Sequence, residues 1–212
     1  MTVLVPTRRA LLVGGVAAMT VAALRPARAD LTPTPRQTPG PFYPRAKPSD
    51  ADADLVSVAG RSGRAQGIVT HVAGRVLDRQ GRPVSGAVVE IWQCDAFGRY
   101  HHPADGGGGD PDFQGYGAVR TGGDGSYRFR TIRPVAYPGR APHIHFAVAG
   151  PGFERLTTQM YVAGEPLNDG DFVLGRIGDP AERARVIVAL SPLGAAEPGA
   201  LAGRFDLVLG AA

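Results

Sequence analysis

Short apolar segments separated by glycine- and proline-containing turns fill the chain from Gly67 onward. Alternating apolar and polar residues are typical of strands that turn one face toward a core. Asp124-Gly125, between two alternating segments, is the favoured sequence of a tight hairpin turn. The predicted strands lie within residues 67–78, 86–95, 118–132, 140–150, 155–164 and 204–210. This spacing predicts an all-β fold, an antiparallel β-sandwich of about seven to nine strands with long loops.

One short helix is predicted near the C-terminus. Asp179 can cap it, Pro180 fits the first helical position, and Glu182 stands at the capping-box distance. We expect this helix to be a packing element. Its apolar face would be formed by Val186, Ile187 and Leu190.

The first 29 residues have the features of an export signal. Arg8-Arg9 precedes an apolar run over residues 10–24, and residues 27–29 (Ala-Arg-Ala) offer a small-x-small cleavage site. The run is too short and too interrupted by glycine for a stable membrane span. The arginine pair favours a twin-arginine signal, with an ordinary secretory signal as the alternative. Both predict a bacterial periplasmic or extracellular protein, with no stable membrane insertion after signal removal.

Residues 30–66 differ in composition from the rest of the chain. They are rich in proline, aspartate, alanine and glycine and show little periodicity, which predicts an extended N-terminal arm lying over the domain. Residues 67–212 would then form one domain, because about 180 residues after the signal suit a single core. Gly106 to Gly109 are typical of a surface loop, since neither a helix nor a Gly-Lys-Ser/Thr pattern follows them.

The charge balance argues against a polyanionic partner. The chain has 23 Lys+Arg and 19 Asp+Glu, but four arginines and no acidic residue lie in residues 1–29. The remaining 19 basic and 19 acidic residues cancel, so nucleic acid and anionic membranes are not expected partners. The single cysteine, Cys94, stands near Trp92 in an apolar run and is expected to be a buried structural thiol.

Two histidines and two tyrosines form the candidate site. His143 and His145 are two residues apart in a predicted strand, so both imidazoles face the same side of a sheet. Tyr100 and Tyr137 precede them in the same central part of the chain. Phenolate is a hard, anionic donor that needs a cation of high charge density, such as iron(III), to form at neutral pH. Tyrosine is an iron ligand in catalase for the same reason.

Each candidate ligand also has an ordinary structural explanation. A tyrosine in a turn commonly packs its ring and leaves its hydroxyl in water. His101 and His102 follow Tyr100 directly and compete with the other two histidines. Because neither has a second histidine on its own face, we expect them to be loop residues or neighbours of the site.

Four longer strings together resemble one protein family. They are TPGPFYP (38–44), GRPVSGAVVEIWQCDAFGRY (81–100), DGSYRFRTIRPVAYPGRAPHIHFAV (124–148) and LTTQMYV (156–162). In this order they are similar to intradiol ring-cleavage dioxygenases of the protocatechuate 3,4-dioxygenase type, in a compact exported form. The joint pattern is far more specific than any one string.

The resemblance implies an iron(III) enzyme that cleaves a catechol with O2 to a cis,cis-muconate-type diacid. The implied ligands are Tyr100, Tyr137, His143 and His145. Tyr137 would be the ligand that leaves when substrate chelates, and would act as the internal base. Arg140 and Gln159 would contact the substrate or the ligands, with Arg140 stabilising negative charge on the substrate. Tyr43 is a candidate for the mouth of the site.

Several alternatives stay open at this point. The segment over residues 74–92 is also typical of non-catalytic β-sandwich modules of the transthyretin-like or carboxypeptidase-regulatory type, which bind carbohydrate or protein. Such a module has no reason to keep all four ligand types at the family spacing. A zinc or copper site is a third interpretation, and two phenolates argue against zinc. No motif places residues for a substrate carboxylate, and the sequence leaves open whether the chain forms a homo-oligomer.

Overall fold

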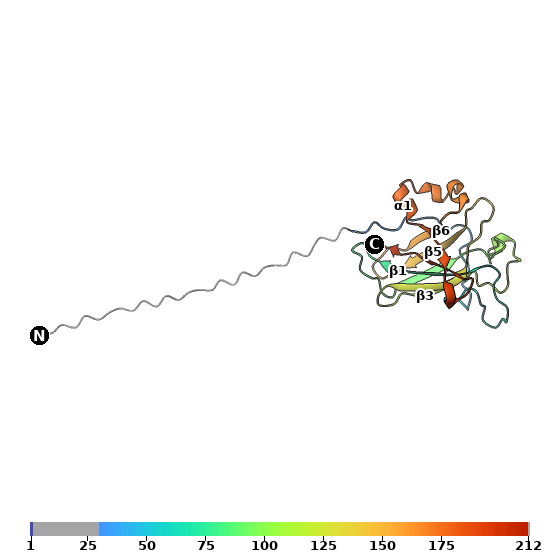
Figure 1. Cartoon of the computed structure of the whole chain (residues 1–212), viewed down its shortest axis with the longest axis horizontal. Helices are drawn as coiled ribbons and strands as arrows, with labels where there is room; N and C mark the ends of the chain where they lie inside the picture. Colours follow the sequence, from blue (N-terminus) through green and yellow to red (C-terminus); the bar gives the residue numbers. More distant parts are fainter. Residues whose placement is uncertain (2–29, 212) are drawn as a thin grey trace.

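Two five-stranded sheets form the centre of the computed structural model, which describes Met1 and residues 30–211 (Figure 1). In the first sheet, β1 pairs with β4, β9 and β10, and β8 pairs with β9. The second sheet has the order β3-β2-β5-β6-β7. The expected export signal falls on residues 2–29, outside the described residues. The strands are β1 (Val69–Leu77), β2 (Val88–Trp92), β3 (Tyr116–Arg120), β4 (Ser126–Ile132), β5 (His143–Ala149), β6 (Leu156–Val162), β7 (Ile187–Val188), β8 (Ser191–Pro192), β9 (Leu201–Arg204) and β10 (Leu207–Val208).

The sandwich is confirmed, but its strand pairing differs from the prediction. The Asp124-Gly125 turn forms, with Gly125 at φ +73°, but β3 before the turn and β4 after it belong to different sheets. The turn therefore does not close a hairpin. Consecutive β1 and β2 are also divided between the sheets. Three pairings, β1 with β9, β1 with β10 and β6 with β7, are parallel, so both sheets are mixed. Turn chemistry specifies a reversal of the chain, whereas packing between the sheets decides which sheet the next strand joins.

The C-terminal helix is shorter than predicted. α1 spans Pro180–Ala184 and lies outside β6 (Figure 1). Its predicted cap is present, because Asp179 Oδ1 accepts a hydrogen bond from Ala181 N at 2.8 Å. The predicted apolar helix face is wrong: the β-branched pair Ile187 and Val188 forms β7 beside β6 instead. The 3-10 helices are η1 (Pro103–Asp105), η2 (Pro166–Gly170), η3 (Leu174–Arg176) and η4 (Gly194–Ala196).

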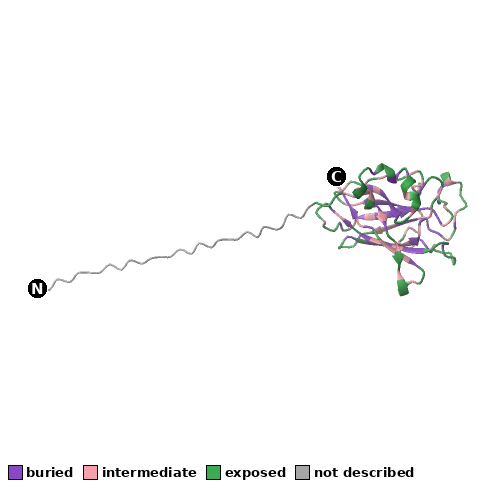
Figure 2. Cartoon of the chain, turned by 45° about the horizontal axis from the view of Figure 1, so that its top comes forward, coloured by how far each residue is buried: buried purple, intermediate pink, exposed green. Residues whose placement is uncertain are grey.

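The main core lies between the two sheets, and the buried positions in Figure 2 follow their strands. Phe129 of β4 and Phe146 of β5 are fully buried there. A second, smaller apolar cluster on the outer face of the second sheet includes Trp92 and Cys94. Burial raises the pKa of the Cys94 thiol to about 12, so it stays protonated at neutral pH. β5 is therefore covered on both faces, which buries its two histidines.

Residues 30–66 run as an extended arm against the sandwich, with no helix and no strand beyond an isolated bridge between Asp54 and Arg130. Backbone hydrogen bonds join the arm to β6 and β3, from Gln37 N to Thr157 O at 2.8 Å and from Ala118 N to Ala51 O at 3.2 Å. The arm thus covers part of the outer face of the second sheet. In the part of the chain that the structure describes, no helix has both the length and the apolarity needed to cross a membrane.

Candidate functional site

The two histidines of β5 point their Nε2 atoms at each other. His143 Nε2 and His145 Nε2 are 3.1 Å apart, and both side chains are about 1 % exposed. The carbonyl oxygen of Ala141 accepts a hydrogen bond from His143 Nδ1 at 2.6 Å, which leaves the lone pair of a neutral imidazole on Nε2. Burial lowers the pKa of His143 to about 4 and that of His145 well below its usual value. Both rings are therefore neutral potential ligands at physiological pH.

The two tyrosines complete the cluster that the sequence predicts. The Tyr100 and Tyr137 rings are 5.5 Å apart and nearly perpendicular. Tyr137 lies 5.5 Å from the His143 ring, and Tyr100 lies 6.1 Å from the His145 ring. Tyr100 is 3 % exposed and Tyr137 is half-buried. The structure thus brings together side chains from the loop after β2, the β4–β5 connection and β5.

The cluster fits a metal ion better than it fits an apolar core. Tyr100 Oη is buried and has no hydrogen-bond partner among the described residues, although such groups normally find one. Burial raises the pKa of both phenols, so each needs a nearby cation to ionise at neutral pH. Two nitrogens bound about 2.1 Å from one ion at a right angle lie about 3 Å apart, close to the observed Nε2 separation.

No other cluster of metal-binding side chains occurs in the part of the chain that the structure describes. Within residues 30–211, no group of three or more His, Cys, Asp or Glu side chains could hold a metal ion. His102 instead caps η1, because its Nδ1 accepts a hydrogen bond from Ala104 N at 3.1 Å. The exposed His101 ring packs against Phe113 at 6.2 Å. Both are loop residues beside Tyr100, as expected.

Arg140 is held beside the cluster by a buried carboxylate. Its Nε donates to Asp171 Oδ2 at 2.9 Å, and both side chains of this ion pair are less than a tenth exposed. Its Nη1 donates to Tyr137 Oη at 3.3 Å, and its Nη2 donates to Gln159 Oε1 at 2.5 Å. Despite the burial penalty, Asp171 and the neighbouring tyrosines raise the pKa of Arg140, so the guanidinium stays charged.

Asp171 is an anchor that the sequence analysis missed. Its carboxylate accepts hydrogen bonds from the backbone N–H groups of Ala141, Val173 and Leu174 at 2.9–3.0 Å, besides the bond from Arg140. These donors lower its pKa although burial opposes ionisation. No spacing in the sequence connects a loop aspartate with an arginine before β5, so only the fold identifies it.

Gln159 links Arg140 to the arm. Its side-chain oxygen accepts hydrogen bonds from Arg140 and, at 2.9 Å, from Tyr161 Oη. Its Nε2 donates to Thr38 O at 2.9 Å, and its backbone N–H donates to Gln37 Oε1 at 2.8 Å. Gln159 is fully buried. It is therefore a connecting residue that fixes both Arg140 and the start of the TPGPFYP string.

The arm passes directly over two members of the cluster. Phe42 stacks on Tyr100 at 4.5 Å and meets the edge of Tyr137 at 6.3 Å. Gly40 lies so close to His145 that an added Cβ would be 3.4 Å from its Cε1 atom, and the glycine has a φ of +68°. Trp92 also stacks on the His145 ring at 4.8 Å. Aromatic rings and backbone thus shield the buried members of the cluster from water.

Tyr43, a candidate for the mouth of the site, is not among the residues that line the hollow beside Tyr137. It packs edge-on against Trp92 at 4.9 Å, and its hydroxyl donates to Glu90 Oε2 at 3.1 Å. The buried Glu90 carboxylate also accepts hydrogen bonds from Lys47, Tyr116 and Arg155. Tyr43 and Lys47 belong to the arm, so Glu90 fastens the arm to β2 next to the cluster. We call this group the Glu90 clamp.

One hollow opens on the exposed side of the cluster. It has a volume of about 370 Å³, within the usual range of small-molecule sites. Because Tyr137 is the only half-buried member of the cluster, this hollow is its accessible side. The lining residues are Tyr137, Gly139, Arg140, Ala141, Pro166, Leu167, Gly170 and Asp171.

Known proteins match most of the chain. A family model described as Dioxygenase matches residues 38–211. The protocatechuate 3,4-dioxygenase beta chain of Burkholderia cepacia is 42% identical over 180 residues, which cover 80% of this chain and 76% of that protein. The 6-chlorohydroxyquinol 1,2-dioxygenase of Cupriavidus pinatubonensis is 37% identical over 155 residues, 64% of this chain and 53% of that protein.

A solved structure gives the same result. The dioxygenase domain of a dioxygenase carbohydrate-binding protein fusion from Streptomyces sp. SirexAA-E has a TM-score of 0.67 and 33% identity. The match covers 85% of this chain and 100% of that domain. The chain spans only about half the length of the curated hydroxyquinol and catechol relatives, for example 49% of catechol 1,2-dioxygenase 1 of Acinetobacter lwoffii.

Proposed function

The chain belongs to the intradiol ring-cleavage dioxygenase family, and we propose that it is an iron(III) enzyme acting on a catechol and O2. Enzymes of this family are oxidoreductases that open the ring between its two hydroxyl-bearing carbons, giving a cis,cis-muconate-type diacid. A non-catalytic binding module is not favoured, because the matching proteins are dioxygenases by name. The proposed iron ligands are Tyr100, Tyr137, His143 and His145.

The convergence of these four side chains carries the proposal. Two neutral imidazoles direct their Nε2 atoms to within 3.1 Å of each other, and two phenols adjoin them in a site closed to water on most sides. Two potential phenolates compensate the charge of a trivalent ion, whereas zinc prefers imidazole, thiolate and carboxylate ligands. The donor set therefore supports iron(III).

Bound iron(III) would act as a Lewis acid that favours ionised phenols and an ionised catechol. Tyr137 is the half-buried phenol beside the hollow, so its Oη can receive a proton from an incoming catechol hydroxyl. Arg140 Nη1, 3.3 Å from that oxygen, stabilises negative charge at this position. Asp171 and Gln159 hold the guanidinium in place. Phe42 keeps water from the Tyr100 side of the site.

Oxygen uptake tests this function most simply. The iron-loaded chain should consume O2 with catechol and give a ring-opened diacid, and removal of iron by a chelator should abolish both. His145→Ala should lose iron and activity together, because it removes a buried ligand, whereas the neighbouring loop variant His101→Ala should keep both. Iron-dependent turnover that survives in His145→Ala would refute the ligand assignment.

We also propose that the chain is exported to the periplasm or beyond. The support is the Arg8-Arg9 pair before the apolar run over residues 10–24 and the Ala-Arg-Ala site at residues 27–29. A twin-arginine route would let the site receive iron before export. In cell fractionation, Arg8→Lys with Arg9→Lys should leave the full-length precursor in the cytoplasm. Export of this double variant at the normal level would exclude the twin-arginine route and favour the ordinary secretory signal.

A further inference from the structure

The two histidines of the cluster are held in different ways. His143 donates from Nδ1 to the carbonyl oxygen of Ala141 at 2.6 Å, and a bond of this kind fixes the ring orientation of most metal-binding histidines. His145 Nδ1 is buried and has no such partner within residues 30–211. The orientation of the His145 ring therefore depends on the side chains that pack against it.

One aromatic ring lies flat against His145. The Trp92 indole stacks on the imidazole with ring centroids 4.8 Å apart and planes only 6° from parallel. Trp92 and His145 are directly opposite each other in the ladder between β2 and β5, so their side chains leave the sheet on the same face. The rings of Tyr100 and His143 also approach His145, but at interplanar angles of 60° and 77°. The face-to-face contact therefore comes from Trp92.

Trp92 is itself held by packing rather than by a hydrogen bond. The residue is 1 % exposed, and its indole N–H has no acceptor in the part of the chain that the structure describes. A buried donor without an acceptor costs free energy, and an apolar side chain in the same place would avoid that cost. Tyr43 of the Glu90 clamp meets the indole edge-on at 4.9 Å. The indole therefore contributes its wide planar ring, which contacts both His145 and the arm.

We propose that Trp92 is a positioning residue, whose stacked indole orients His145 toward the iron in place of a hydrogen bond at Nδ1. The inference rests on the proposed function. An imidazole that binds iron(III) becomes more positive, and the face of an indole attracts positive charge, so the stack favours the metal-bound state as well as the ring orientation. Because Tyr43 packs on the same indole, the stack also connects the arm to the site.

Two substitutions of similar size separate ring stacking from space filling. Trp92→Phe keeps an aromatic face, whereas Trp92→Met leaves an apolar side chain without one. In a titration against a competing chelator, Trp92→Met should weaken iron(III) binding by at least about tenfold, as the loss of a group that orients a metal ligand does. Its tyrosinate-to-iron band should move to longer wavelength, because a poorly placed imidazole donates less charge to the metal. Trp92→Phe should stay within about threefold of wild type and keep the band position, because its ring can still stack.

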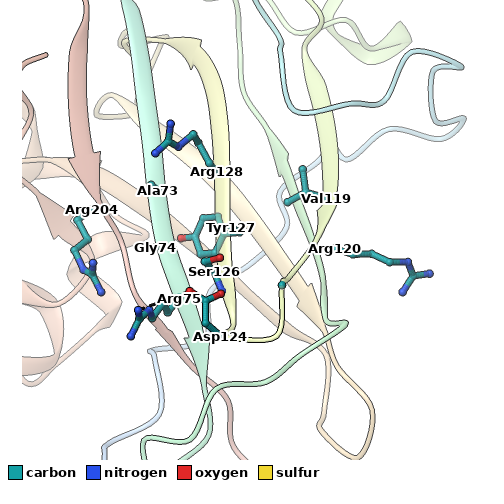
Figure 3. A pocket seen from close by; sticks show the side chains of 11 residues that line it. Ala73, Gly74, Arg75, Val119, Arg120, Asp124, Ser126, Tyr127, Arg128 and Arg204 are labelled. Atoms are coloured by element: carbon teal, nitrogen blue, oxygen red, sulfur yellow. Dashed lines mark hydrogen bonds and ion pairs between the residues drawn. The ribbon is translucent and has the colours of Figure 1, made fainter. Parts of the chain in front are cut away.

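Tyr127→Met is the matched control. Tyr127 is also a buried aromatic residue, but it belongs to the main core. It lines a cleft of about 560 Å³ beside β1 and β4 that none of the four proposed ligands lines (Figure 3). Tyr127→Met should lose stability in urea, followed by circular dichroism, and should keep the iron affinity and the band of the wild type.

The outcomes separate this inference from the proposed function. Wild-type iron affinity and band position in Trp92→Met would overturn the positioning role and leave the iron site standing. An equal loss of affinity in Trp92→Phe, or in Tyr127→Met, would also overturn it, because space filling or general stability would then explain the effect. If Trp92→Met does not fold, Trp92→Phe decides, and an iron affinity about tenfold below wild type would overturn the inference. If the wild-type chain binds no iron, the proposed function fails, and the positioning role fails with it.

Discussion

Replacing Glu90 by glutamine should loosen the arm from the second sheet. The Glu90 side chain is 3 % exposed, and its clamp holds Tyr43 and Lys47 of the arm. Glutamine keeps the size of the side chain but removes the charge that Lys47 and Arg155 share. Because Phe42 stacks on Tyr100 next to the clamp, loosening the arm should also disturb the packing around the cluster.

The clamp lowers the pKa of Glu90 from 4.5 to about 2, although burial opposes ionisation. At about 1.36 kcal/mol per pH unit, this corresponds to roughly 3 kcal/mol of stability. The side chains of Lys47 and Arg155 are 52 % and 46 % exposed, so solvent screening reduces the expected loss to about 1–3 kcal/mol. Because the folded-state pKa is the lower one, the contribution is complete above about pH 4.5 and disappears as the pH falls toward 2.

Urea unfolding at pH 7 and at pH 3 measures this contribution. The chain has one tryptophan, and Trp92 packs against both Tyr43 and His145, so its fluorescence reports on the arm and the site. Glu154→Gln is a matched control, because Glu154 pairs with Arg36 of the arm but is 60 % exposed. The Glu90→Gln variant should lose stability at pH 7 and lose less at pH 3. Equal stability of wild type and Glu90→Gln at pH 7 would refute the reasoning.

Three further variants test separate parts of the site. Gly40→Ala should cost about 1–2 kcal/mol in unfolding free energy because of its positive φ, while the added Cβ would meet His145 Cε1 at an ordinary contact distance of 3.4 Å; an unchanged unfolding free energy would contradict this. Asp171→Asn leaves the Arg140 guanidinium buried without its anion and should destabilise the fold by about 3–5 kcal/mol in urea; a loss below about 1 kcal/mol would contradict this. Tyr137→Phe should retain iron but lose about 100-fold or more in turnover, measured by oxygen uptake; full activity would exclude Tyr137 as the base.

The candidate site could be predicted because its key residues are close in sequence and their geometry is local. Two residues of separation in a strand place His143 and His145 on one face whatever the rest of the fold does. Tyr100, Tyr137 and Arg140 could be predicted as site residues because they stand in strings that resemble one protein family. The fold class likewise follows from short alternating segments and their turns.

The remaining features depend on contacts that no local pattern encodes. Asp171 meets Arg140 only because η2 folds back beside the strand that carries the histidines. Glu90 looks like an ordinary polar position of an alternating strand until the arm covers it. The Asp124-Gly125 turn predicts that the chain reverses, but it does not predict which sheet β4 joins. Tertiary packing decides each of these, and it also ends α1 so that Ile187 can pair with Tyr161.

The central claim is that two phenolates and two imidazoles of this chain hold iron(III), and the visible spectrum of the iron-loaded protein tests it most directly. The account predicts a red-brown protein with about one iron per chain and a tyrosinate-to-iron charge-transfer band. The band should weaken in Tyr100→Phe and in Tyr137→Phe, while Tyr127→Phe, whose hydroxyl binds the backbone oxygen of Phe205 in the main core, should leave it unchanged. A colourless protein that takes up no iron, or a band that neither Tyr100→Phe nor Tyr137→Phe alters, would contradict the account.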